Sequence, residues 1–190
     1  MARTVGPAPI FQFKITLKGS KPPIWRRVLV SSAGSLADLH KVIQGAMGWM
    51  DYHLHEFEVG ALRVGEPDPD WDDGEVEEET KFPLRKVFSA PKTKVLYTYD
   101  FGDDWEHIVL LEAVLPADPT QVLPRCVAGA RACPPEDVGG IWGYDEALES
   151  LKDPTDSEHA SWKAWFPEGF DAAAFDLDQV NEALTGKAGT

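Results

Sequence analysis

Two short strings concentrate the side chains of this sequence that could do chemistry: HLHEFE at 53–58 and DFGDDWEH at 100–107. Their imidazole and carboxylate groups suit the binding of zinc, iron or manganese. The same groups suit general acid–base catalysis, because an imidazole titrates near neutral pH. With two acids from further along the chain, the predicted polar cluster comprises His53, His55, Asp100, Asp103, Asp104, Trp105, His107, Glu136 and Asp137.

Strand alternation predicts which of these side chains share a face. Residues two apart in a strand point to the same side of a sheet, which groups His53 with His55 and Trp105 with His107. If both faces point inward at neighbouring strand ends, three imidazoles could converge beside the carboxylates at 100–104. The alternative is structural, because a strand histidine usually belongs to the core and an Asp pair in a tight turn serves the turn.

Two cysteines, Cys126 and Cys133, extend the set of candidate metal ligands. Six residues separate them, whereas structural zinc sites commonly use spacings of about two to four. Together with His53, His55 or His107 they could complete a four-ligand site, so the candidate cofactor is a divalent metal such as zinc. The alternatives are a redox pair or two small buried side chains.

Motifs of other reaction classes are absent from the sequence. The string CPPEDVGG at 133–140 resembles the start of a helix, and no Lys-Ser/Thr follows it as a phosphate loop requires. Neither G-x-S-x-G nor G-x-G-x-x-G occurs. The seven Trp residues, the acidic run after residue 65 and the order of the predicted elements favour a non-enzymatic interaction module. A metal-dependent enzyme built on the His, Asp and Cys residues is the alternative.

The charge distribution bears on the class of partner. The net charge is −14, and residues 95–190 hold nineteen acids against five bases. Such a chain is a poor nucleic-acid binder, because phosphate contacts need Lys and Arg. We therefore expect a protein partner, with DNA binding through a basic N-terminal hairpin as the weaker alternative. The basic residues of that hairpin are Lys14, Lys18, Lys21, Arg26 and Arg27.

Hydrophobic periodicity predicts an α+β fold. Apolar residues alternate on both sides of a Gly- and Pro-containing turn, which indicates a hairpin. A helix is predicted at 35–47, with Ser35 and Asp38 as a capping box. A hairpin, then a helix, then further strands is the order of a β-grasp-like mixed sheet. The predicted strands are 11–18, 24–30, 54–62, 94–101 and 105–115, with a short helical turn at 83–88.

The 190 residues are predicted to form a single domain. Residues 9–116 are predicted as a β-rich core with one long helix, and 66–80 as an acidic loop. Residues 117–185 are predicted as an irregular Pro- and Gly-rich segment, followed by helices that pack against the sheet. Those helices are predicted at 144–151, 158–165 and 175–184.

Targeting signals are not visible in the sequence. The N-terminus lacks the apolar stretch of a signal peptide, and no segment approaches the ~20 apolar residues of a membrane helix. Two cysteines are too few for a disulfide scaffold. We therefore expect a cytoplasmic protein without membrane contact.

Several widely spaced strings resemble one protein family. They are IWRRVLV, LADLHKVIQGAMGW, HLHEFEVG, YDFGDDWEH, PRCVAGARACPPEDVGG and GFDAAAFDLDQVN. In this order, over about residues 9–185, they resemble the plasmid pRiA4b ORF-3-like family. The resemblance implies a compact α+β domain whose relatives occur on plasmids and chromosomes, some beside insertion elements. It implies no particular reaction, so a mobile-element accessory role joins protein interaction as the leading expectation.

Overall fold

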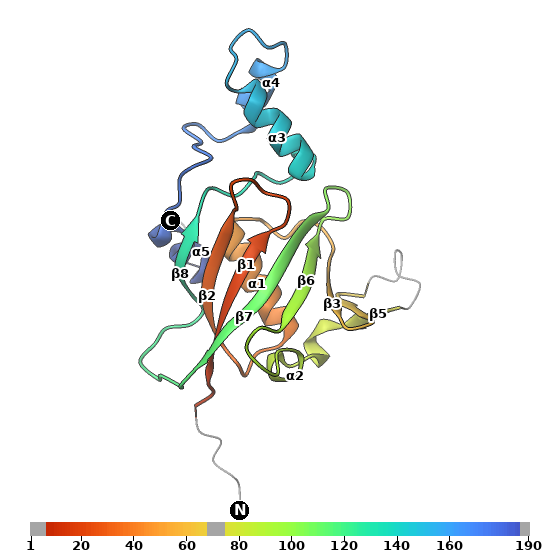
Figure 1. The fold of residues 1–190 in the computed structure, drawn as a ribbon, viewed down its shortest axis with the longest axis vertical. Helices are drawn as coiled ribbons and strands as arrows, with labels where there is room; N and C mark the ends of the chain where they lie inside the picture. Colours follow the sequence, from red (N-terminus) through yellow and green to blue (C-terminus); the bar gives the residue numbers. More distant parts are fainter. Residues whose placement is uncertain (1–6, 68–74, 187–190) are drawn as a thin grey trace, which may run out of the picture.

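The computed structural model describes residues 7–67 and 75–186, and these form one eight-stranded mixed sheet with helices (Figure 1). The strands are β1 (Ile10–Leu17), β2 (Trp25–Ser31), β3 (His55–Val59), β4 (Leu62–Gly65), β5 (Val76–Glu78), β6 (Lys94–Tyr99), β7 (Trp105–Leu115) and β8 (Arg125–Ala130). Their order in the sheet is β5-β4-β3-β6-β7-β1-β2-β8. The β4–β5 pair is parallel and the other neighbouring pairs are antiparallel.

The helices lie on one face and at one end of the sheet. The α-helices are α1 (Leu36–Met47), α2 (Leu84–Val87), α3 (Gly140–Ser150), α4 (His159–Trp165) and α5 (Leu177–Leu184), and a 3-10 turn, η1, covers Glu79–Lys81. In Figure 1, α1 crosses behind the central strands, while α3 and α4 lie beyond the sheet at the top. α5 contacts α1 and β8. Among the described residues, no helix is long and apolar enough to cross a membrane.

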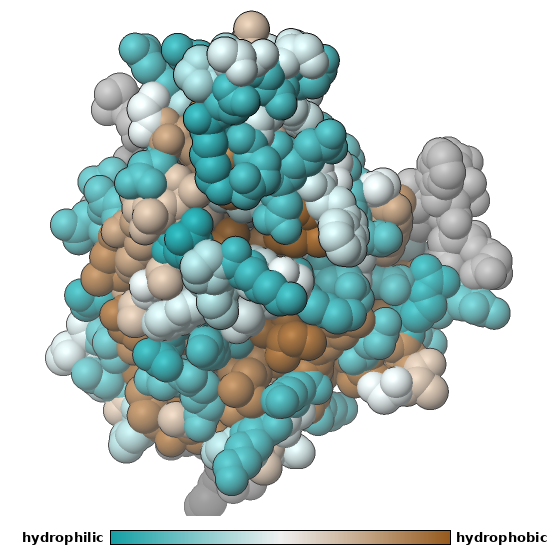
Figure 2. All heavy atoms as spheres, turned by 45° about the horizontal axis from the view of Figure 1, so that its top comes forward, coloured by the Kyte–Doolittle hydropathy of each residue, from teal (hydrophilic) through white to brown (hydrophobic). Residues whose placement is uncertain are grey.

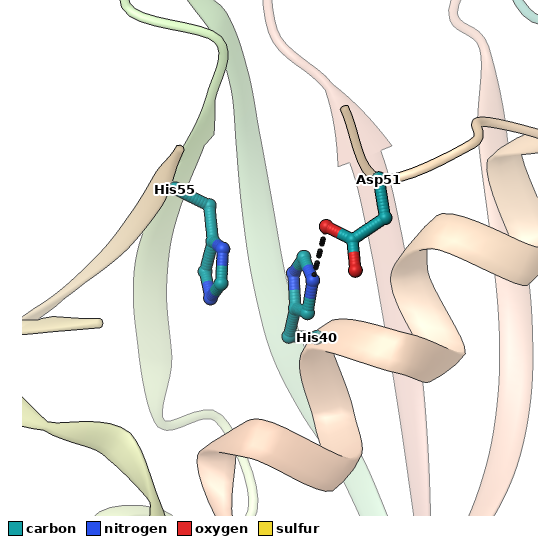
Figure 3. A group of neighbouring side chains, drawn as sticks. All are labelled: His40, Asp51 and His55. Atoms are coloured by element: carbon teal, nitrogen blue, oxygen red, sulfur yellow. Dashed lines mark hydrogen bonds and ion pairs between the residues drawn. The ribbon is translucent and has the colours of Figure 1, made fainter. Parts of the chain in front are cut away.

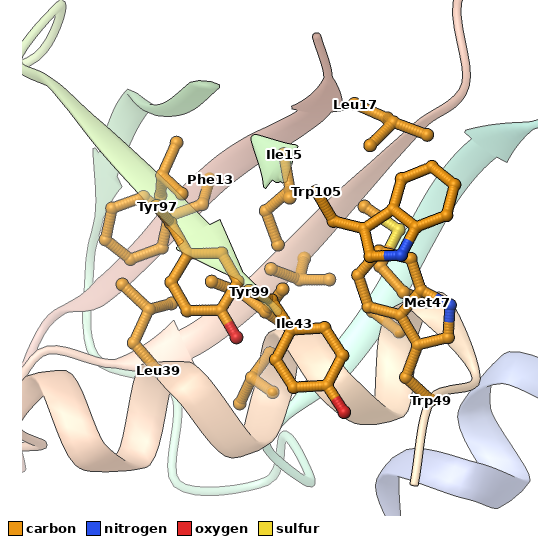
Figure 4. Close-up of a cluster of buried hydrophobic side chains, with 14 of the residues drawn as sticks. Phe13, Ile15, Leu17, Leu39, Ile43, Met47, Trp49, Tyr97, Tyr99 and Trp105 are labelled. Atoms are coloured by element: carbon orange, nitrogen blue, oxygen red, sulfur yellow. The ribbon is translucent and has the colours of Figure 1, made fainter. Parts of the chain in front are cut away.

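The core lies between α1 and the inner face of the sheet. Alternate residues of β1 point inward, and β1 is an inner strand of the sheet, between β2 and β7. Figure 4 shows these side chains meeting the apolar stripe of α1. The buried residues labelled there are Phe13, Ile15, Leu17, Leu39, Ile43, Met47, Trp49, Tyr97, Tyr99 and Trp105.

The start and end of α1 confirm the predicted caps. The Ser35 side chain accepts from the Asp38 backbone N–H, and the Asp38 carboxylate accepts from the Ser35 N–H at 2.8 Å. At the other end Gly48 has φ 83°, a left-handed conformation that glycine adopts at little cost. These caps fix the direction in which the chain leaves α1 toward residues 49–55, which carry part of the candidate site.

Several predicted elements have different bounds in the structure. The strand predicted at 54–62 is two strands, β3 and β4, because the chain turns at Gly60 with φ 66°. The segment predicted to be irregular contains β8, which pairs with β2. The predicted acidic loop at 66–80 includes β5 and part of η1, and residues 68–74 lie outside the described residues.

The α+β class is confirmed, and the β-grasp-like description stays a prediction. The C-terminal helices differ in their contacts from the prediction. α5 packs on α1 and β8, whereas α3 and α4 contact each other beyond the sheet. Tyr144 and Ala147 of α3 are buried, but Trp165 of α4 is exposed rather than packed on the sheet.

Candidate functional site

One imidazole and two carboxylates meet where β3, β6 and the segment before α3 come together. His53 Nε2 lies 2.9 Å from Asp137 Oδ1 and 3.6 Å from Asp100 Oδ2. The facing atoms of the three side chains all lie within 4.8 Å of one another. We call His53, Asp100 and Asp137 the sheet-end cluster. All three belong to the predicted polar cluster, although they come from three separate stretches of sequence.

The turn after β6 positions the Asp100 carboxylate. Asp100 has φ 59°, a left-handed conformation that Asp tolerates better than most residues. Its Oδ1 accepts from the backbone N–H of Gly102 at 2.9 Å and of Asp103 at 3.4 Å. The other oxygen, Oδ2, is therefore held toward His53.

Asp137 is held by contacts of its neighbours. The Tyr99 hydroxyl donates to Glu136 Oε1 at 2.5 Å, and Glu136 Oε2 accepts from the Met50 N–H at 2.9 Å. Trp49 Nε1 donates to the Pro134 carbonyl at 3.0 Å. These bonds attach the 134–136 segment to the sheet, and burial together with the Glu136 contact raises the pKa of Tyr99.

The Gly pair of CPPEDVGG is explained by a close approach to the β6–β7 turn. The Gly139 N–H donates to Asp103 Oδ2 at 3.1 Å. Gly140 has φ 66°, and a Cβ there would lie 2.2 Å from the Asp103 carbonyl oxygen. Only glycine allows α3 to start this close to the turn. Asp103 thus anchors α3, and it is Asp100 that faces the imidazole.

A second group of titratable side chains lies inside the protein. The rings of His40 and His55 are parallel, with 3.5 Å between centroids and 5° between planes (Figure 3). His40 Nε2 bonds Asp51 Oδ1 at 2.9 Å, and His55 Nε2 bonds Glu79 Oε2 at 2.8 Å. We call His40 and His55 the histidine stack. The other His40 nitrogen, Nδ1, lies 2.9 Å from the Tyr97 hydroxyl.

Burial sets the charge of His40. It lowers the pKa of His40 to about 4, and the neighbouring His55 acts in the same direction. Asp51 and Glu79 act in the opposite direction but do not outweigh burial. His40 is therefore neutral at pH 7.

The predicted convergence of three imidazoles is wrong. β6 lies between β3 and β7 in the sheet, so Tyr97 and Tyr99 fill the space between the two histidine-bearing strands. His107 is fully buried, 5.6 Å from the Tyr97 ring, and burial lowers its pKa to about 4. His53 precedes β3, so strand alternation does not govern its direction.

Cys126 lies in the core and the half-buried Cys133 packs against it, so neither lies beside the histidines of the predicted cluster. Cys126 Sγ donates to the Ala128 carbonyl at 3.4 Å. Cys133 Sγ lies 3.1 Å from Arg26 Nη2, and burial raises the pKa of its thiol to about 11. Within the described residues, neither cysteine joins a group of potential metal ligands, so the predicted four-ligand site is not formed.

The other two residues of the predicted cluster have structural surroundings. Asp104 is exposed in the β6–β7 turn with φ 52°. Trp105 is buried, with 5.6 Å between its ring and that of Trp49. Asp104 therefore belongs to the turn, and Trp105 belongs to the core.

Comparison with known proteins agrees with this fold and these motifs. The model of the family described as "Plasmid pRiA4b ORF-3-like protein" matches residues 9–179. The chain belongs to the plasmid pRiA4b ORF-3-like family. It is 39% identical over 178 residues to the uncharacterized protein y4hQ of Sinorhizobium fredii (strain NBRC 101917 / NGR234), covering 93% of this chain and 91% of that protein.

A solved structure has the same architecture as this pRiA4b ORF-3-like chain. It is the crystal structure of MM3350, a protein of unknown function from Methanosarcina mazei Go1, with a TM-score of 0.81 and 39% identity. The likeness covers 90% of this chain and 96% of that chain. The comparisons therefore establish family and fold, and the relatives' names assign no reaction.

Sequence reasoning about this pRiA4b ORF-3-like chain missed the histidine stack. His40 lies on the apolar face of α1, between Leu36 and Ile43, so helical periodicity alone could have placed it inside. Glu79 gave no comparable signal, because it sits in an acidic run of similar residues. Asp51 lies in the connection after α1, where no periodic pattern fixes the side-chain direction.

The basic hairpin of the pRiA4b ORF-3-like chain is largely engaged by other residues. Arg26 is buried, donates to the Ala46 carbonyl at 3.0 Å and lies 4.7 Å from the Phe175 ring. Arg27 pairs with Glu112 at 2.5 Å. Lys18 pairs with Glu106 at 2.8 Å.

Proposed function

We propose that this protein is a non-enzymatic interaction module whose partner presents a basic segment. The observation that carries the proposal is a cavity beside α4 of about 270 Å³, in which two indoles and two carboxylates come together. Its lining residues are Asp137, Glu158, Ser161, Trp162 and Trp165.

The cavity has the chemistry that recognises a Lys or Arg side chain. Indole faces attract cations through their quadrupole, worth about 0.5–1 kcal/mol at exposed sites and more where water is excluded. The Glu158 carboxylate adds charge attraction at the same place, whereas Asp137 Oδ1 faces His53. Sites that enclose a small molecule are typically about 300–1,000 Å³, so this smaller cavity suits a single long side chain.

The surroundings of the cavity support the same class of partner. Trp165, which lines the cavity, is 51% exposed. Aromatic side chains are enriched at protein interfaces, and their exposure on a free surface is costly. Figure 2 shows hydrophilic side chains gathered over the upper part of the molecule, where α3 and α4 lie. Residues 95–190 hold nineteen acids against five bases, which favours a cationic partner.

A basic partner also suits an accessory role on a mobile element. Proteins that act on DNA carry basic segments because phosphate contacts need Lys and Arg. Direct DNA binding by this chain has less support, because Arg26 is buried and Lys18 and Arg27 are in ion pairs.

Selection from a random 12-residue peptide display library on the full chain tests the proposal. We expect the bound peptides to be enriched in Lys and Arg. Their affinity should fall about tenfold for Trp165→Ala, the equivalent of about 1.4 kcal/mol, as expected for loss of a partly desolvated cation–π contact. Glu158→Gln should weaken binding and reduce its salt dependence.

Trp142→Ala is the matched control, since Trp142 is more exposed than Trp165 and does not line the cavity. It should bind the selected peptides as the unsubstituted chain does. Selection of apolar or acidic peptides would contradict the proposal. So would equal loss of affinity in Trp142→Ala and Trp165→Ala, because that would point to a general hydrophobic surface.

A further inference from the structure

The sheet-end cluster concentrates negative charge around one imidazole nitrogen. Asp100 and Asp137 face the same atom, His53 Nε2, from two directions. Among the described residues, neither carboxylate pairs with a Lys or Arg side chain. Two carboxylates this close repel each other unless a cation or a shared proton lies between them. One imidazolium would offset one of the two carboxylate charges, whereas a divalent cation would offset both.

Hydrogen bonding within the cluster is poorly aligned. His53 Nε2 is a buried atom without a well-aligned hydrogen-bond partner among the described residues, although Asp137 Oδ1 is 2.9 Å away. The carboxylate oxygens thus lie away from the direction in which an N–H would point. An ion placed between the three side chains would satisfy the nitrogen and both oxygens together.

We propose that His53, Asp100 and Asp137 bind one divalent transition-metal ion, of the class of Zn²⁺ or Mn²⁺. Ligand atoms about 2.1 Å from such an ion are roughly 3.0–3.4 Å apart in tetrahedral or octahedral arrangements. The observed separations are 2.9 and 3.6 Å from the nitrogen, and the facing atoms are all within 4.8 Å of one another. Small side-chain rotations close the remaining difference. A mixed imidazole and carboxylate set suits zinc, iron and manganese better than magnesium.

Contacts behind each ligand hold the site in place, as outer partners do in metal centres. The turn amides fix Asp100 Oδ1, which leaves Oδ2 for the ion. The Tyr99 hydroxyl accepts from the His53 backbone N–H at 3.3 Å and donates to Glu136, the neighbour of Asp137. One phenol thus ties two of the ligand-bearing segments together.

The cluster is open to solvent on one side. The His53 side chain is 31% exposed and that of Asp137 is 55% exposed. An ion can therefore enter, and water can fill the coordination positions that three protein ligands leave free.

The histidine stack is the rival metal site, because His40, Asp51 and His55 also place their ligand atoms within 4.8 Å of one another. An imidazole donates to a metal in the plane of its ring. The two ring planes are parallel and 3.5 Å apart, so their in-plane lone pairs do not converge on one point (Figure 3). The sheet-end cluster has no such obstacle, since it contains a single imidazole.

Isothermal titration of chelator-treated full-length protein with Zn²⁺, Mn²⁺ and Mg²⁺ tests the proposal. We expect one Zn²⁺ per chain, weaker Mn²⁺ binding in line with the general order of divalent affinities, and the weakest binding for Mg²⁺. His53→Ala and Asp137→Asn should each weaken Zn²⁺ binding at least about 100-fold, since even outer-shell changes cost about 10–100-fold. Asn tolerates the left-handed backbone of Asp137, so that variant should fold.

Asp51→Asn is the matched control, because it removes a carboxylate from the rival group and should leave Zn²⁺ binding unchanged. Circular dichroism and urea denaturation of each variant show that lost binding is not lost folding. Absence of saturable binding would overturn the proposal. Unchanged affinity in the folded His53→Ala and Asp137→Asn variants, or a matching loss in Asp51→Asn, would overturn it as well.

Discussion

The imidazole rings of His40 and His55 lie face to face, 3.5 Å apart between centroids. Each ring also bonds a carboxylate: His40 bonds Asp51 and His55 bonds Glu79. Two protonated rings at this separation would repel strongly in a buried place. The stack thus joins α1 to β3 and η1 most firmly when His40 is neutral, which makes that contact sensitive to acid.

The free energy of unfolding should fall as the pH drops from about 6.5 toward 4. His40 and His107 each have a folded-state pKa of about 4, below the ordinary 6.5. Between these pH values the two histidines bind protons in the unfolded chain but not in the folded chain. The contribution of these two histidines to the free energy of unfolding is fully present above pH 6.5. It is lost as the pH falls, by roughly 2 kcal/mol per histidine at pH 5. Urea denaturation at pH 7.0 and 5.0 measures the loss, and equal stability at both would contradict it.

His107→Phe should reduce that acid sensitivity. His107 contacts Trp49 and Tyr97, and its ring nitrogens meet the backbone groups of Trp105 and Tyr97 only in poorly aligned contacts. A phenyl ring fits an aromatic pocket and has no proton to gain. We expect stability within about 1.5 kcal/mol of the original at pH 7, and a pH 7-to-5 loss smaller by roughly 2 kcal/mol. The same urea series checks this, and an unchanged loss would show that His107 does not titrate as described.

Tyr99→Phe should loosen the segment that carries Asp137. The substitution removes the donor to Glu136 and the acceptor for the Tyr52 and His53 N–H groups. We expect a loss of about 1–3 kcal/mol, because partly buried polar groups lose their partner. Tyr52→Phe is the control, since the Tyr52 side chain is exposed, and it should cost less than about 0.5 kcal/mol. Urea denaturation of both variants gives the comparison, and equal costs would count against this role of Tyr99.

Gly140→Ala should cost more stability than Gly169→Ala. Both glycines have positive φ, 66° and 75°, so each substitution carries the left-handed strain of about 1–2 kcal/mol. A Cβ at Gly140 would also meet the Asp103 backbone at 2.2 Å, whereas nothing lies within 4 Å at Gly169. The difference between the two variants in thermal or urea denaturation measures the close approach alone. We expect it to exceed about 1 kcal/mol, and the absence of a difference would show that the close approach to Asp103 does not constrain residue 140.

Local patterns predicted the elements that are built from nearby residues. The Ser35 and Asp38 cap and the strand pairs β1–β2 and β6–β7 follow from capping chemistry, alternation and short turns. β8 was not predicted, because its sequence contains Gly and Ala and has weak strand propensity. It forms because β2 offers a free edge, which is information about the neighbour rather than about the string itself.

The sequence predicted which residue types form the candidate site, but not which of the candidate residues come together. His53, Asp100 and Asp137 were each singled out, yet His55 and His107 were assigned to the same cluster. The strand order separates His107, because β6 inserts its tyrosines between β3 and β7. His55 is separated from His53 because its ring points into the core and stacks on His40. Arg26 shows the same limit: a cation in an alternating strand predicted a basic surface, whereas the structure buries it against Ala46 and Phe175.

β1 pairs with one strand that is near in the sequence and one that is distant, which affects how the chain folds. Its hairpin with β2 can form early, since the two strands are neighbours in sequence. Its other partner, β7, is separated by about a hundred residues, as the Gln12–Glu112 bond illustrates. Closing such a loop lowers the chain entropy before the stabilising contact has formed. Folds rich in distant pairings accordingly fold in about milliseconds to seconds. The rate-limiting event should therefore be the docking of the β6–β7 hairpin beside β1.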